Sequence, residues 1–211
     1  HYTDEDLRQV TLNYGAAPAE CMEPGVPCIL TAGDFDREVF RLRDLILETR
    51  PEAVFTHEVQ DNNPEHYATA MLVKKAFRAA LDEGYDGSLL FSHTVGSCRF
   101  GYLYNVWDTF VDTTGYLDDK RRAIAVHACQ MPYVERLDHT DSLYGEILGV
   151  ETAETFTICE LSSTRQGALS DELRRNHAYC CENFQRLFFT PENRAKLEGF
   201  FEWVRKKNHT F

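Results

Sequence analysis

The sequence predicts an α/β protein, a Rossmann-like three-layer sandwich built around a mostly parallel sheet. Short apolar runs at residues 53–55, 88–92 and 155–159 read as buried strands, and longer amphipathic segments separate them. Helix-start signals stand in front of two amphipathic segments, as Asn63-Pro64-Glu65 and Thr190-Pro191-Glu192. Strands that alternate with helices form βαβ units, whose connections favour parallel strands covered by helices on both faces.

The first part of the chain supplies a strand, helix, strand, helix pattern. The expected elements are a helix at 4–14, a strand at 27–30, a helix at 36–49, a strand at 53–55 and a helix from residue 64. Asn63 can cap that last helix and Pro64 fits its first position, because proline has a fixed φ and no N–H to satisfy. Its apolar stripe, which should face the sheet, consists of Val73, Ala76, Phe77, Ala80 and Leu81.

The second part continues the alternation. We expect strands at 88–92, 102–112 and 155–159, helices at 117–130 and 143–150, and a helical tail from residue 171. In that tail, a stripe recurs at helical spacing, which predicts that the last helix packs on a core; it consists of Leu197, Phe200, Phe201 and Val204. The resulting domain prediction is a partial α/β domain over residues 1–160 and a helical extension over 161–211 packed on the same domain.

Composition narrows the function classes. The chain has 211 residues with 43% hydrophobic side chains, enough for a sizeable core, and a net charge of −12 that argues against a nucleic-acid surface. It lacks a long apolar run, so no membrane span is expected, and its acidic start does not resemble a signal peptide. Seven cysteines without CxxC spacing indicate reduced thiols in a cytoplasmic protein.

A polar segment after the strand at 53–55 is the main candidate site. It carries Thr56, His57, Glu58, Asp61, Asn63 and His66 between the strand and the following helix. Ligands of open α/β sheets gather just beyond the carboxyl ends of strands. The sequence therefore predicts a binding or catalytic site at this strand-to-helix elbow.

The segment THEVQDNNPEHYAT resembles the T-H-D and H-P-D-H-x-A region of LmbE-like, or PIG-L-like, zinc-dependent N-acyl deacetylases. Two later segments are similar to further motifs of that family, in the same order. Lys120, Ala123, His127 and Gln130 match its K-x-x-A-x-x-x-H-x-S-Q segment, and residues 153–156 match its A-E-x-F.

The resemblance implies a zinc-dependent hydrolase that removes an N-acyl group from an amino sugar or a related small molecule. His66 matches a metal ligand, and Asn63 stands where the family has a histidine that stabilises the oxyanion. Asp61 is a candidate base and His127 a candidate pocket residue, whereas we expect His57 to orient the elbow. For each side chain a structural role is the alternative: Asn63 as a helix cap, Asp61 as a turn former and His127 as a core histidine.

The family's first motif, A-H-P-D-D-E, has no good counterpart. His1 and Asp4 keep its H-x-x-D ligand spacing and are the remaining metal-ligand candidates, but Thr3 stands where the base belongs. The alternative is that a companion polypeptide completes the fold. Two other functions remain open, a non-catalytic LmbE-like binding protein and an α/β enzyme without a metal.

Overall fold

The computed structural model of the chain describes residues 32–59, 64–92, 107–125 and 134–208. The expected helix at 4–14 and strand at 27–30 lie outside these ranges. The chain divides into two compact units, one of residues 1–99 with 157–170 and one of residues 100–156 with 171–211. The expected domain boundary at residue 160 stays a prediction. No helix in the described ranges is both long enough and apolar enough to span a membrane.

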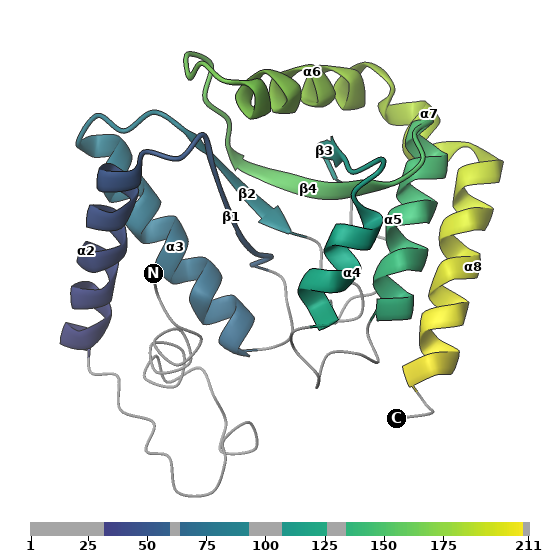
Figure 1. Cartoon of the computed structure of the whole chain (residues 1–211), viewed down its shortest axis with the longest axis horizontal. Helices are drawn as coiled ribbons and strands as arrows, with labels where there is room; N and C mark the ends of the chain where they lie inside the picture. The colour runs from purple at the N-terminus through teal and green to yellow at the C-terminus, as the bar shows by residue number, and fades with distance from the viewer. Residues whose placement is uncertain (1–31, 60–63, 93–106, 126–133, 209–211) are drawn as a thin grey trace, which may run out of the picture. The chain divides into compact units, whose positions relative to one another are not determined.

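The helices and strands are shown in Figure 1. The first unit contains α2 (Ala32–Thr49), β1 (Ala53–His57), α3 (Pro64–Asp82) and β2 (Ser88–Ser92). β4 (Ala153–Glu160) and α6 (Ala168–Glu182) each contribute residues to both units. The second unit also contains β3 (Thr109–Asp112), α4 (Leu117–Ala125), α5 (Val134–Leu148), α7 (Phe184–Phe189) and α8 (Pro191–Asn208).

The four described strands form one sheet in the order β1-β2-β4-β3. β1 and β2 are parallel, with Ala53 opposite Ser88 and His57 opposite Ser92. β3 and β4 are antiparallel, with Asp112 opposite Ala153. The sheet is therefore mixed, and the prediction of a mostly parallel sheet is wrong.

Two helices in succession explain the reversal of β4. α4 and α5 run antiparallel, as the paired side chains show: Lys120 with Asp141, and Arg121 with the earlier residue Asp138. A pair of antiparallel helices returns the chain to the end of the sheet from which it left. The first residue of β4, Ala153, consequently pairs with the last residue of β3.

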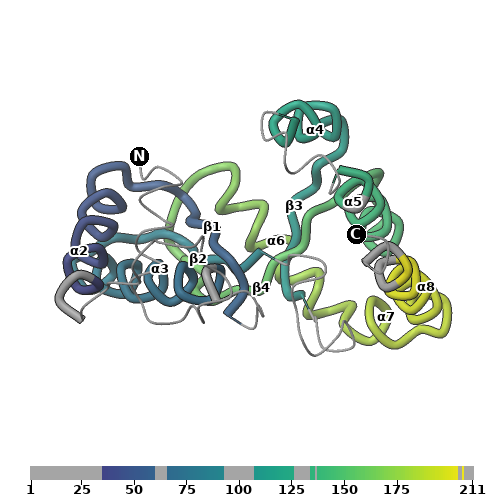
Figure 2. The backbone as a smooth tube through the Cα atoms, turned by 90° about the horizontal axis from the view of Figure 1, so that it is seen from below, coloured from purple at the N-terminus to yellow at the C-terminus, as the bar shows by residue number. Residues whose placement is uncertain are grey.

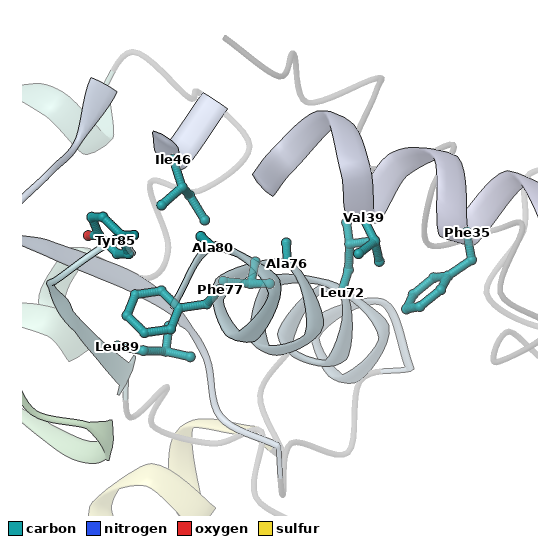
Figure 3. Close-up of a cluster of buried hydrophobic side chains, with 10 residues drawn as sticks. Phe35, Val39, Ile46, Leu72, Ala76, Phe77, Ala80, Tyr85 and Leu89 are labelled. Atoms are coloured by element: carbon teal, nitrogen blue, oxygen red, sulfur yellow. The ribbon is translucent and has the colours of Figure 1, made fainter. Parts of the chain in front are cut away.

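In the first unit, α2 packs on α3, and α3 packs on β1 and β2. Figure 3 shows the buried side chains between them. The cluster consists of Phe35, Val39, Ile46, Leu72, Val73, Ala76, Phe77, Ala80, Tyr85 and Leu89. Four residues of the apolar stripe predicted for α3, from Val73 to Ala80, are thus confirmed as core, and Leu81 is partly buried against it. The Tyr85 hydroxyl donates to the Pro51 carbonyl at 2.7 Å, which fastens the turn before β2 to the start of β1.

The end of β4 and the segment that follows it, residues 157–170, belong to the first unit. The Ser162 amide donates to the Ser88 hydroxyl at 3.1 Å, and the Thr164 hydroxyl donates to the Asp86 carboxylate at 2.8 Å. The Ser170 amide donates to the Glu52 carboxylate at 2.9 Å. These bonds fix the segment to residues at the starts of β1 and β2.

The second unit has an aromatic core. Trp107 is buried against the rings of Tyr144 and Phe188, with centroids 4.9 and 4.4 Å away. Helices α5 and α8 lie side by side in Figure 2, and Phe200 and Phe201 of α8 are buried as its stripe predicted.

Helix α5 extends further than the sequence indicated. It begins at Val134, before the expected start at residue 143, because charged residues interrupt the apolar pattern of its first turns. It ends where Gly149, with a φ of 84° typical of a left-handed cap, donates its amide to the Gly145 carbonyl at 2.8 Å. The expected strand at 102–112 is β3 in its described part, and the helix expected at 117–130 is described up to Ala125.

Candidate functional site

The elbow between β1 and α3 brings two histidines together. His57 is the last residue of β1, and His66 lies in the first turn of α3, which begins at Pro64 as predicted. Their imidazole rings are parallel, with centroids 4.0 Å apart. Both side chains are half-buried. The stack fixes the orientation of His66 relative to the end of the strand.

Buried polar residues precede and follow His57 in the sequence. Thr56 is buried, and its hydroxyl has no hydrogen-bond partner among the described residues. The Glu58 side chain is also buried, at 7% exposure, and its carboxylate accepts a hydrogen bond from the Val59 amide at 2.8 Å. Burying a carboxylate and a hydroxyl is costly unless they are hydrogen-bonded. Glu58 meets this requirement through the Val59 amide, and Thr56 does not within the described residues.

Ring geometry limits how these histidines can hold a metal ion. An imidazole binds a metal along a nitrogen lone pair in the ring plane, at about 2.0–2.1 Å for zinc. Because the two rings are parallel and stacked, a single ion can lie in the plane of His66 or of His57, and not of both. This fits one histidine ligand backed by a second ring.

The other predicted site residues lie outside the described ranges. They are the catalytic candidates Asp61, Asn63 and His127 and the metal-ligand candidates His1 and Asp4. Their roles stay predictions. Within the described ranges, no three His, Cys, Asp or Glu side chains are grouped closely enough to form a metal site.

The second and third sequence motifs meet in a charged cluster. Lys120, from the K-x-x-A segment, forms ion pairs with Glu154, from the A-E-x-F segment, and with Asp141 of α5 at 2.5 Å. Asp141 is buried at 3% exposure. Burial opposes the charge on Lys120, but the carboxylates of Glu154 and Asp141 outweigh it and hold its pKa above the ordinary value. The motif lysine and glutamate therefore join α4 to β4.

Asp141 was not singled out from the sequence, because an aspartate on a helix is ordinarily a surface residue. Burial raises its pKa to about 6, although the Lys120 ammonium acts in the opposite direction. The folded protein consequently holds this proton more tightly than the unfolded chain does. Ionisation of Asp141 between about pH 4 and pH 6 lowers the free energy of unfolding, by about 3 kcal/mol at most.

Comparison of the wild type with Asp141→Asn should isolate the contribution of Asp141 to this pH dependence, since asparagine does not ionise. We expect the free energy of unfolding of the wild type, relative to that of the variant, to fall as the pH rises from 4 to 7. Urea unfolding at several pH values measures it. Asp138→Asn, which removes the partly exposed partner of Arg121, is the control and should show a change of less than about 1 kcal/mol. A difference independent of pH would contradict the expectation.

Comparison with known proteins identifies the fold. No family model matches the chain. The structure is similar to that of GalB, the 4-carboxy-2-hydroxymuconate hydratase from Pseudomonas putida, with a TM-score of 0.50 and 23% sequence identity over 63% of this chain and 62% of the hydratase. It is also similar to the conserved protein TT1542 from Thermus thermophilus, with a TM-score of 0.49 and 20% identity over 63% of each chain.

The likeness shows the fold alone. The chain has an α/β fold similar to that of the hydratase, with a mixed four-stranded sheet in its described part. It spans less than two thirds of the length of either similar chain. Activity, substrate and partners are therefore matters of proposal.

Proposed function

We propose that the chain belongs to a metal-dependent enzyme of the LmbE-like type that makes a water molecule nucleophilic. Its proposed reaction is hydrolysis of the N-acyl group of an amino sugar or a related small molecule. The observation that supports this most is the stack of the half-buried His66 ring on the His57 ring at the end of β1. A metal site needs a ligand whose orientation is fixed in advance, and the stack restricts the His66 imidazole in this way.

Each candidate residue has a distinct role in this proposal. His66 binds the metal, and His57 orients it through the stack. Asp61 takes the proton of the attacking water, and Asn63 donates a hydrogen bond to the oxyanion. His127 lines the pocket. When bound, zinc lowers the pKa of a water ligand and polarises the acyl oxygen.

The remainder of the metal shell has two possible sources. His1 and Asp4 have the spacing of the family's two other ligands, and both belong to this chain. A companion polypeptide is the other source, and it would complete the sheet as well. Intact mass and gel filtration of the purified protein distinguish the two sources, because only the second requires another polypeptide in the active species.

Hydration of a carbon–carbon double bond is a second candidate reaction. It is favoured by the similarity of the fold to a 4-carboxy-2-hydroxymuconate hydratase. Hydrolysis and hydration both begin with an activated water molecule and differ in the group that water attacks. The same metal site therefore serves either reaction, and the substrate distinguishes them.

Metal content tests the proposal directly. We expect about one zinc ion per complete site in the wild-type protein, measured by elemental analysis after dialysis, and a loss of that zinc in His66→Ala. His139→Ala is a matched control, because His139 lies on α5, stacks on Phe200 and Trp203 and has no part in the elbow. No metal in the wild type even after addition of zinc would contradict the proposal and favour a binding protein.

Turnover then separates the two reactions. An N-acetylated amino sugar should release acetate, which an enzyme-coupled assay detects. 4-carboxy-2-hydroxymuconate should lose its ultraviolet absorbance if the protein is a hydratase. Turnover of the second compound alone would contradict the deacetylase assignment while leaving the metal site in place.

A further inference from the structure

One face of α6 is fixed to β3 by hydrogen bonds at helical spacing. The Thr109 hydroxyl donates to the Leu173 carbonyl at 3.1 Å, and the Asn176 amide nitrogen donates to the Phe110 carbonyl at 2.8 Å. In the next position, Nδ1 of His177 lies 2.8 Å from the Asp108 carbonyl oxygen. Residues 173, 176 and 177 thus share one face, and the His177 ring is held in place.

The bond to Asp108 determines which ring nitrogen of His177 carries the proton. A carbonyl oxygen only accepts, so Nδ1 must be the donor and Nε2 of the neutral ring keeps its lone pair. The Sγ atom of Cys181 lies 3.7 Å from Nε2 and 3.9 Å from Nδ1. These near-equal distances place the sulfur off the axis of the Nε2 lone pair, so transfer of the thiol proton to Nε2 requires rotation of the exposed cysteine side chain.

The three described cysteines differ sharply in surroundings. Cys181 is exposed, Cys159 is half-buried and Cys180 is buried at 2% exposure. Burial, with smaller contributions from Asp108 and Cys181, raises the pKa of Cys180 to about 12, and burial also raises that of Cys159. Two of the three thiols are therefore poor nucleophiles at neutral pH, whereas the third is accessible and has an oriented base beside it.

We propose that Cys181 and His177 form a thiol–imidazole pair, a modification site at which Cys181 exchanges with low-molecular-weight disulfides. The arrangement has the three parts that activate a nucleophile: an accessible thiol, a base within reach, and a group that orients the base. Asp108 supplies the third part through its main-chain oxygen. The site is independent of the elbow at His66 and of the proposed hydrolase activity.

The exchange requires no oxidant other than the small disulfide itself, because one S–S bond forms and one breaks. The Cys181 S–H bond breaks and its proton moves to Nε2 of His177, while Nδ1–H continues to donate to Asp108. The thiolate attacks one sulfur of the small disulfide, a new S–S bond forms to Cys181, and the old S–S bond breaks. The leaving thiolate takes the proton from Nε2 and departs as a thiol.

Oxidised glutathione and site-resolved mass spectrometry test the proposal. The full chain is incubated with the disulfide at pH 7, and fragment ions assign the mixed disulfide to a cysteine. We expect Cys181 to be modified fastest of the three described thiols and Cys180 to stay unmodified. In His177→Ala the rate at Cys181 should fall about tenfold at pH 7, and it should approach the wild-type rate near pH 10, where a thiol ionises without a base.

Cys180 also reports whether the variant is folded. Labelling of Cys180 in His177→Ala would reveal unfolding, in which case His177→Gln, whose side chain can still donate to Asp108 but is no base, replaces it. Equal rates at Cys181 in the wild type and a folded variant at pH 7 would overturn the proposal. So would the absence of any mixed disulfide at Cys181 in the wild type.

Discussion

Replacing His66 by alanine is expected to lower turnover by more than about 100-fold and to remove the bound metal, while the chain stays folded. The imidazole is half-buried in the first turn of α3, where its loss leaves no large cavity. Its proposed role as a ligand has no substitute in the stack, because the ring of His57 is parallel to it and directs its lone pairs into another plane. The measurements are turnover, zinc content and a circular dichroism melt.

Two variants of His57 test whether its ring orients His66 as a ligand. His57→Phe keeps a flat ring against His66 and removes the nitrogens, whereas His57→Ala removes the ring as well. If the stack orients the ligand, His57→Phe should retain most of the metal affinity and His57→Ala should lose about 10- to 100-fold. Loss of the metal in His57→Phe with retention in His66→Ala would mean that the two histidines have the opposite roles.

A second large effect is expected at Gly145. This glycine lies inside α5, where a Cβ atom would overlap the main-chain carbonyl of Glu151 and the Cα of Thr152. The obstacle is backbone rather than the end of a flexible side chain, so it cannot turn aside. Gly145→Ala should therefore lower the free energy of unfolding by about 3 kcal/mol or more, from overpacking alone.

Gly199 provides the matched control for that variant. It lies inside α8, and a Cβ there would meet no atom within 4 Å. Gly199→Ala should raise the free energy of unfolding by about 0.5–1 kcal/mol, because alanine has the higher helix propensity. Urea unfolding of both variants gives the comparison. A stabilising Gly145→Ala would show that α5 does not approach residues 151 and 152 as closely as described.

Local signals in the sequence were sufficient for most elements. Pro64 marks the start of α3 and Pro191 that of α8. Proline suits the first helical position because its φ is already close to the helical value and it has no N–H that would need a partner. The apolar spacing of Ala76, Phe77 and Ala80 identified the buried face of α3. These features depend on residues that lie within one or two helical turns of each other, so the sequence alone is sufficient to predict them.

Strand direction could not be predicted in the same way. The run at 155–159 is apolar whichever way β4 enters the sheet, and its direction follows from the pairing of α4 with α5. The charged cluster was missed for a related reason. Asp141 becomes buried through contacts with Lys120, a residue distant in sequence, and nothing in its immediate neighbours marks it.

The candidate site was predicted in part. The elbow and the position of His66 followed from the strand, the proline and the family resemblance. The stack on His57 depends on how far α3 is rotated relative to β1, a quantity that the segment between them does not encode. The buried state of Glu58 likewise reflects packing, since the sequence shows only a polar residue after a strand.

The bonds of Ser162, Thr164 and Ser170 to residues at the starts of β1 and β2 have a consequence for biosynthesis. A chain emerging from the ribosome presents α2, β1, α3 and β2 early, yet the groups that fasten the starts of those strands are translated only near residue 170. The amino-terminal unit therefore cannot acquire its full stability as it is made and must wait for most of the polypeptide. Nascent chains that end before residue 157 should accordingly be much more sensitive to proteases than the complete chain.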